Sequence, residues 1–187
     1  MVTAAKPAAA TAGAIHVAAT TATLPTTAQG TLATDFKDLG YISDAGVTRT
    51  LSMESTDIKD WGGTTVLSIG TGKTEQFKFA LIEADKLEAM KLVYTSAAAE
   101  TSGDITASQG ADNRTAHAFV IDMVLEGNKI QRIVIPNGKV ASISDIVYVN
   151  NAVVSFELTI TAMADASGNT SYDYIHTNTT PTPGSPT

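Results

Sequence analysis

Hydrophobic and polar residues alternate with a period of two along most of the chain, a pattern typical of strands that bury one side. The clearest case runs from Val153 to Ala162. Its apolar residues share one face: Val154, Phe156, Leu158, Ile160 and Ala162. Its polar residues share the other: Ser155, Glu157, Thr159 and Thr161. The pattern predicts a mostly β fold whose sheet has one side facing water.

The same alternation predicts further strands at 65–69, 75–81, 118–125, 130–135 and 140–149. Turn residues separate these stretches: Gly70 and Gly72, Gly127-Asn128, and Pro136-Asn137-Gly138. We therefore expect a hairpin around Gly70–Gly72 and short connections at the other two places. Short connections imply that neighbouring strands are antiparallel.

One helix is predicted between the strands, from Glu83 to Tyr94. Leu87, Met90 and Tyr94 fall on one face of it, and acidic residues come early, which suits the helix dipole. We expect that stripe to pack on a sheet. The small, polar stretch 95–114 predicts a loop that contains a short strand.

The two ends of the chain differ in composition from its centre. The first 34 residues hold 12 Ala and nine Thr, and Lys6 is the only fully charged residue among them. This predicts a flexible N-terminal arm over 1–34, although Ile15, Val17 and Leu24 offer it apolar side chains to bury against a partner. Residues 177–187 are rich in Thr and Pro and predict a disordered tail, which leaves a β-rich domain at 35–176.

Charge and cysteine content exclude several functions. The 12 basic and 19 acidic residues give a net charge of −7, which disfavours binding that depends on neutralising phosphates. The absence of cysteine excludes disulfides, thiolate zinc sites and cysteine nucleophiles. Apolar runs are short and no signal-peptide core is visible, so we expect a chain made in a cytoplasm, with no membrane span.

Motif analysis predicts no catalytic, cofactor or metal site. Residues 70–74, Gly-Thr-Gly-Lys-Thr, resemble the end of a phosphate-binding loop, but Leu67 stands where its first glycine belongs. The residues that follow alternate as a strand, whereas such a loop must open into a helix. His16, His117 and His176 lack metal-ligand spacing, and no nucleophile elbow is present. We therefore expect a protein that is not an enzyme.

The only tryptophan lies in a polar stretch, residues 54–63, beside two glycines. A large aromatic residue in a segment otherwise suited to water is typical of a contact loop with an anchor. The alternative is that Trp61 covers the domain's own core.

Five segments carry a resemblance to a known family: 40–43 (GYIS), 55–63 (STDIKDWGG), 77–83 (FKFALIE), 132–139 (RIVIPNGK) and 159–162 (TITA). In order and spacing they resemble the major tail protein of siphoviruses, most closely that of phages of actinobacteria. The resemblance spans residues 34–175. It does not cover the Ala/Thr-rich arm or the Thr/Pro-rich tail.

The resemblance implies a tail tube protein with two packed antiparallel sheets and a flanking helix, related to the type VI secretion tube protein. It implies hexameric rings, joined edge to edge by their inner sheets and stacked into a tube that conducts DNA. The N-terminal arm and one early loop would contact the next ring, with the loop residues at Glu54, Asp57, Ile58, Lys59, Asp60 and Trp61. It also implies tape measure and tail terminator proteins as partners, and a virion tail assembled in the host cytoplasm.

Six copies would bring 6 × (−7) = −42 charges to a ring, a field that lets DNA pass without specific binding. Candidates for the side chains that line the channel are Lys78, Ser155, Glu157 and Thr159. A rival interpretation from the two tails is a secreted or surface β-sandwich binding module with flexible linkers.

Overall fold

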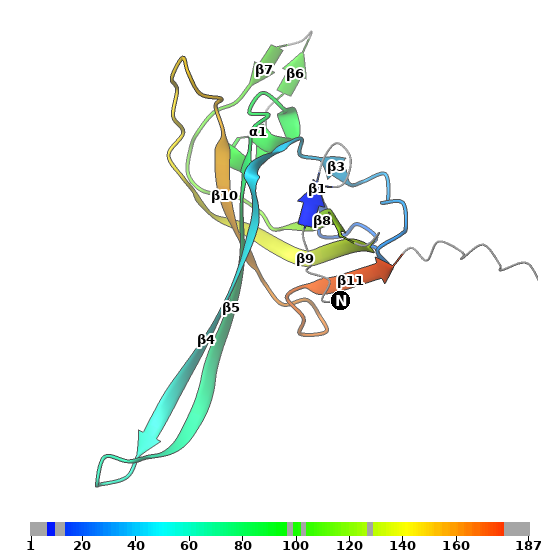
Figure 1. Ribbon diagram of the computed structural model, residues 1–187. Coiled ribbons are helices and arrows are strands. Elements are labelled where there is room, and N and C mark those ends of the chain that lie inside the picture. Colours follow the sequence, from blue (N-terminus) through cyan, green and yellow to red (C-terminus); the bar gives the residue numbers. More distant parts are fainter. Residues whose placement is uncertain (1–6, 10–13, 97–98, 102–103, 127–128, 178–187) are drawn as a thin grey trace, which may run out of the picture.

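The computed structural model describes residues 7–9, 14–96, 99–101, 104–126 and 129–177 of the 187 (Figure 1). The elements follow one another as β1 (Pro7–Ala9), β2 (Ile15–Ala19), β3 (Lys37–Asp38), β4 (Ile42–Lys59), β5 (Thr65–Leu81), α1 (Leu87–Val93), β6 (Ala99–Thr101), β7 (Asp104–Thr106), β8 (His117–Leu125), β9 (Lys129–Ile143), β10 (Phe156–Ala162) and β11 (Tyr172–Thr177). The predicted turn at 127–128 and most of the predicted tail lie outside the described residues.

Nine strands form one antiparallel sheet in the order β3-β2-β8-β9-β10-β5-β4, with β1 also paired to β8 and β11 to β9. Strand β9 belongs to two halves of this sheet, because its first part pairs with β8 and β11 and its last part pairs with β10. The prediction of a mostly β, antiparallel fold with one helix is confirmed. The two expected sheets are halves of one sheet that continues through β9.

The main core lies between the two halves of the sheet and α1. In β10 the predicted alternation is confirmed, since Phe156, Leu158 and Ile160 are buried while the residues between them are only partly so. The helix is shorter than predicted, because residues 83–86 form a turn in which the Lys86 amide donates to the Glu83 carbonyl. Its buried residues are Ala89, Leu92 and Val93, while Met90 and Tyr94 pack at the edge of the core. The predicted stripe was therefore only partly right.

Part of the expected N-terminal arm is built into the domain. Strand β2 pairs with β8, and Ile15 is fully buried. The segment after β2 covers the other face of β8 and is held there by Arg132, whose Nη1 donates to the carbonyls of Thr27 (3.2 Å) and Gly30 (2.8 Å). Arg132 in turn pairs with Asp122 on β8 at 2.6 and 2.9 Å. The prediction of a flexible arm over the whole of residues 1–34 therefore differs from the structure, in which β2 and the segment after it pack on the domain.

Two predicted turns are irregularities within long strands. Pro136–Gly138 lies inside β9, where the register to β8 shifts. Proline lacks an amide hydrogen and is tolerated at such bulges, so the signal marks a bend in the strand. Gly70 and Gly72 lie inside β5, where Ser55 and Glu54 face them across a register shift. The predicted hairpin turn there is wrong, as is the predicted strand beyond Ile143.

Candidate functional site

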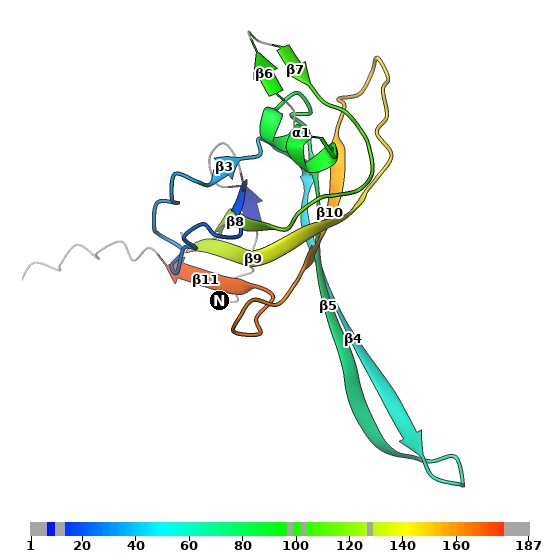
Figure 2. The ribbon, with the colours of Figure 1, turned by 180° about the vertical axis from the view of Figure 1, so that it is seen from behind.

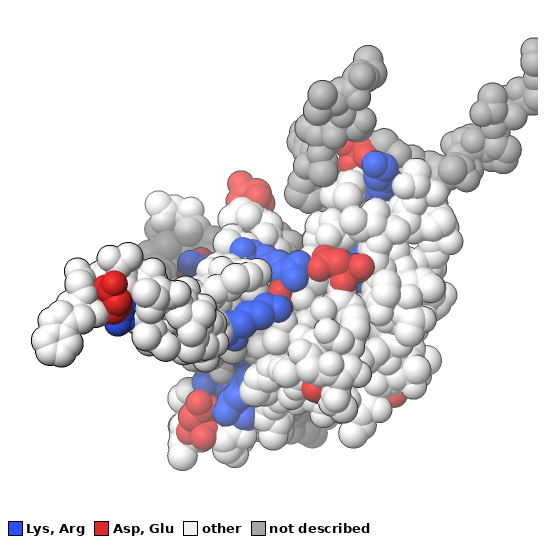
Figure 3. Space-filling model, turned by 90° about the horizontal axis from the view of Figure 1, so that it is seen from below, with Lys and Arg blue, Asp and Glu red and all other residues white. Residues whose placement is uncertain are grey.

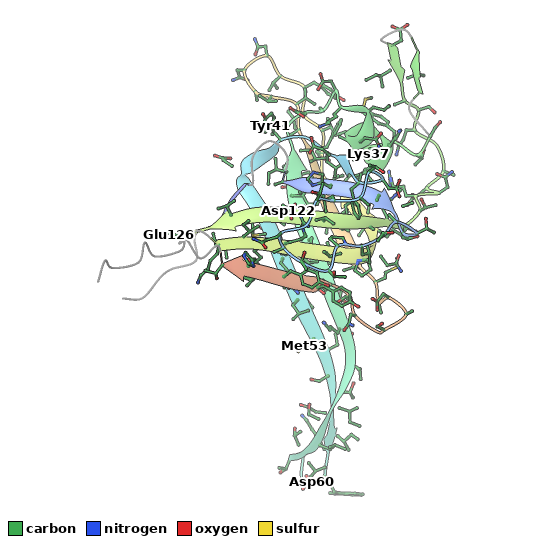
Figure 4. The ribbon with its side chains drawn as sticks, turned by 90° about the vertical axis from the view of Figure 1, so that its right-hand side faces the viewer. Lys37, Tyr41, Met53, Asp60, Asp122 and Glu126 are labelled. Atoms are coloured by element: carbon green, nitrogen blue, oxygen red, sulfur yellow. The ribbon has the colours of Figure 1, made fainter. Side chains whose placement is uncertain are left out.

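Strands β4 and β5 form a hairpin that extends far beyond the body of the domain (Figures 1 and 4). The end of β5 contributes Phe77, Phe79 and Leu81 to the core, whereas every residue from 48 to 74 is exposed. We call residues 48–74 the projecting hairpin. At about 3.3 Å per residue its strands reach about 35 Å out of the body.

The turn at the end of this hairpin is organised by Asp60. Its amide donates to the Thr64 carbonyl at 2.9 Å, and its carboxylate accepts from the Thr64 amide at 2.8 Å. Gly63, whose amide donates to the Asp60 carbonyl, has a φ of +85°, which glycine adopts without strain. The predicted contact loop is therefore mostly strand, since 54–59 belong to β4 and only 60–64 form the turn. Asp60 holds the turn that presents Trp61.

Trp61 is 105% exposed, so the interpretation that it covers the domain's own core is wrong. Six further large apolar side chains of the projecting hairpin are exposed: Leu51, Met53, Ile58, Val66, Leu67 and Ile69. Of the residues predicted for contact, Glu54, Asp57, Ile58 and Lys59 are also exposed and follow one another along β4 (Figure 4 marks Met53 and Asp60). An isolated two-stranded hairpin cannot bury its apolar side chains in a core of its own. The apolar residues on the projecting hairpin therefore indicate a surface that a partner covers.

The base of the hairpin is fixed by a buried carboxylate. Glu75 is fully buried and accepts hydrogen bonds from Arg49 Nε (2.6 Å), Ser171 Oγ (3.0 Å) and Thr170 Oγ1. Arg49 also pairs with Asp173 of β11 at 2.7 Å. Burial alone would raise the pKa of Glu75, but the hydrogen bonds from Thr170, Ser171 and Arg49 outweigh it and lower that pKa. The hairpin is thereby anchored to β11 and the segment before it.

The residues predicted to line a channel lie together beside this base. Lys78 of β5 faces Thr159 of β10 across the ladder, on the side of the sheet away from the core. Its Nζ pairs with Glu157 Oε1 at 3.0 Å, and Ser144 Oγ donates to the same carboxylate, so the pKa of Glu157 is lowered by Ser144 first and Lys78 second. Ser155 directly precedes β10 and is partly exposed. The structure thus brings Lys78, Glu157 and Thr159 onto neighbouring positions of one sheet, with Ser155 just before β10.

Other motifs take structural places. Residues 70–74, which resemble a phosphate-binding loop, lie within β5, and that strand continues to Leu81 without opening into a helix. Within the described ranges, no three His, Asp or Glu residues gather as a metal site requires. No helix in that part of the chain has the length and hydropathy to cross a membrane.

A sheet that carries a long, anchored hairpin with exposed apolar residues along it indicates a protein that contacts other subunits. The sequence model of a family described as phage tail tube proteins matches residues 4–185, nearly the whole chain. The chain belongs to this family of structural proteins, which places it in the phage virion tail and implies assembly with itself into a tube. Among curated proteins, none matches the chain.

Proposed function

We propose that six copies of this chain close into a ring, and that rings stack into the hollow, non-contractile tail tube of a siphovirus, through which DNA passes during ejection. The projecting hairpin carries the proposal, because it offers one neighbour a long surface that no part of the described domain covers. In this arrangement Glu54, Asp57, Ile58, Lys59, Asp60 and Trp61 contact the next ring.

Free strand edges support closure into a ring. In the described part of the sheet, β4 is the last strand on one side and pairs only with β5, and its residues 42–47 lie in the body, apart from the projecting hairpin. An open edge of this kind pairs readily with another chain, and a closed ring satisfies it without further growth. Stacking then extends the assembly along one axis only.

Charge supports passage of DNA. Each ring of six would carry 6 × (−7) = −42 charges, which repel phosphates. We propose that Lys78, Ser155, Glu157 and Thr159 face the channel; there the charge of Lys78 is offset by its ion pair with Glu157. At the end from which the hairpin projects, Lys and Arg lie beside it with Asp and Glu interspersed (Figure 3). Mixed charge at this end does not oppose stacking.

The wider setting belongs to the same proposal. We propose that the tube assembles in the cytoplasm of the host cell. A tape measure protein would lie inside the tube, and a terminator protein would bind at its end. The resemblance to phages of actinobacteria suggests the group of hosts.

Negative-stain electron microscopy of the purified protein across a concentration series tests the proposal. Hollow rings at lower concentration and tubes with a central channel at higher concentration are expected. Monomers throughout the series, together with monomers after addition of tube fragments as seeds, would contradict it.

A further inference from the structure

A second apolar surface lies at the end of the molecule opposite the projecting hairpin. It is the connection between β9 and β10, residues 144–155, which lies beside α1, β6 and β7 at that end (Figures 1 and 2). Four of its large apolar residues are well exposed: Val147 (60%), Tyr148 (70%), Val149 (47%) and Val153 (71%). Asp145 is the only charged residue in this connection.

This connection borders a groove. Its lining is mostly apolar and holds one carboxylate, that of Asp85: Ala84, Asp85, Met90, Tyr94, Ile105, Tyr148, Val154 and Phe156. Tyr94 and Tyr148 both line this groove, and burial first, then the neighbouring Tyr148, raises the pKa of Tyr94. Tyr94 also packs edge-on against Phe156, with ring centroids 6.4 Å apart. The groove therefore offers aromatic walls to an incoming side chain.

The core of the single chain leaves the outer side of this surface uncovered, since Val147, Tyr148, Val149 and Val153 are exposed. Alternating residues predict a strand as far as residue 149, yet β9 ends at Ile143, so Val147 and Val149 lack a strand to pair with. Exposed apolar residues that lie singly need no explanation, but a contiguous group beside an apolar groove indicates an interaction site.

We infer that this surface, the 144–155 connection and its groove, receives the projecting hairpin of a second copy, with Trp61 entering the groove. The inference rests on the proposed stacking. A head-to-tail contact needs two different surfaces, one at each end of the molecule, and the described residues place an apolar surface at each of two opposite ends. An exposed tryptophan on one and an aromatic-walled groove on the other form an anchor and its pocket.

The chain has no cysteine, so an engineered pair reports a single contact. The double variant Gly62→Cys/Val147→Cys places one thiol beside Trp61 and one beside Tyr148 and keeps both aromatic residues. A flexible bismaleimide added to assembled tubes should then link the thiol at position 62 of one copy to the thiol at position 147 of the next. A ladder of covalent oligomers on a denaturing gel is expected. Gly62→Cys with Ile175→Cys is the matched control and should give no ladder, because Ile175 is exposed but lies on β11, far from α1 and β10 (Figure 1). Val153→Cys replaces Val147→Cys if the first pair fails to assemble.

Tubes that form normally but give no ladder with either pair would overturn the inference while leaving the proposed function intact. Failure of the cysteine-free chain to form tubes would instead count against the proposed function. Trp61, the only tryptophan, supplies a second readout. Its emission should shift to the blue on assembly, and it should do so less in tubes of Tyr148→Ala; unchanged emission in wild-type tubes would also overturn the inference.

Discussion

Replacing Trp61 with alanine separates folding from assembly. The side chain is 105% exposed in the single chain, so its loss should change the free energy of unfolding by no more than about 0.5 kcal/mol. In the proposed tube the same truncation would remove an anchor. A buried aromatic side chain covers about 150–250 Å², which at about 25 cal/mol per Å² sets an upper limit of about 4–6 kcal/mol. Truncation of an interface anchor costs about 2 kcal/mol or more, and we expect about 2–4 kcal/mol here.

A loss of about 2–4 kcal/mol per contact raises the concentration needed for assembly by about 30-fold to 1,000-fold. Sedimentation across a concentration series measures that threshold, and thermal unfolding followed by circular dichroism measures stability. Ile175→Ala is the control, because Ile175 is also an exposed apolar residue (60%) but lies on β11. The reasoning fails if Trp61→Ala assembles at the wild-type concentration, or if it abolishes cooperative unfolding.

Three further predictions concern the body of the domain, each measured by urea unfolding. Arg49→Ala should lower the free energy of unfolding by about 1–3 kcal/mol, because it leaves buried Glu75 with fewer donors; an unchanged midpoint would contradict this. The folded-state pKa of Glu75 is lowered, so its stabilisation is present above the unfolded pKa near 4.5 and is lost as pH falls through the folded pKa. The stability gap between wild type and Glu75→Gln should therefore narrow below pH 4.5, whereas a constant gap would disagree. Gly138→Ala should cost about 1–3 kcal/mol, because a Cβ there would lie 2.8 Å from Phe119 and 2.9 Å from Ile160; wild-type stability would show that the site has room.

The alternation of residues predicted strands well where one face is buried and the other is not. Strand β10 is such a case, and its buried and partly buried residues follow the predicted order. Strand β8 is buried on both faces over much of its length, because the segment after β2 covers its second face. That cover depends on Arg132, which acts across more than 100 residues of sequence, so local pattern could not reveal it.

Glycine and proline misled the prediction in the long strands. At Gly70–Gly72 and at Pro136–Gly138 the chain bends and shifts register but continues as a strand. A turn and a bulge use the same residue types, and only the partner strand decides between them. The true turn, Asp60–Thr64, also contains two glycines, Gly62 and Gly63, directly after Trp61. Glycine content alone therefore does not separate this turn from the bulge at Gly70–Gly72.

Composition marks residues 54–63 as a candidate contact segment, but it does not predict the geometry of that segment. The sequence places Glu54–Trp61 in a polar segment, whereas the structure extends that segment into a hairpin that reaches about 35 Å out of the body. The apolar residues on β5, such as Leu67 and Ile69, were assigned to a half-buried strand because nothing local distinguishes a core face from a face kept for a neighbour.

Averaged cryo-electron microscopy images of assembled tubes test the central claim most directly. The account predicts a hollow tube with sixfold rings, in which the β4–β5 hairpin of each copy crosses a ring boundary and contacts a copy in the next ring. A filament without a channel, or hairpins that contact only copies of their own ring, would contradict it.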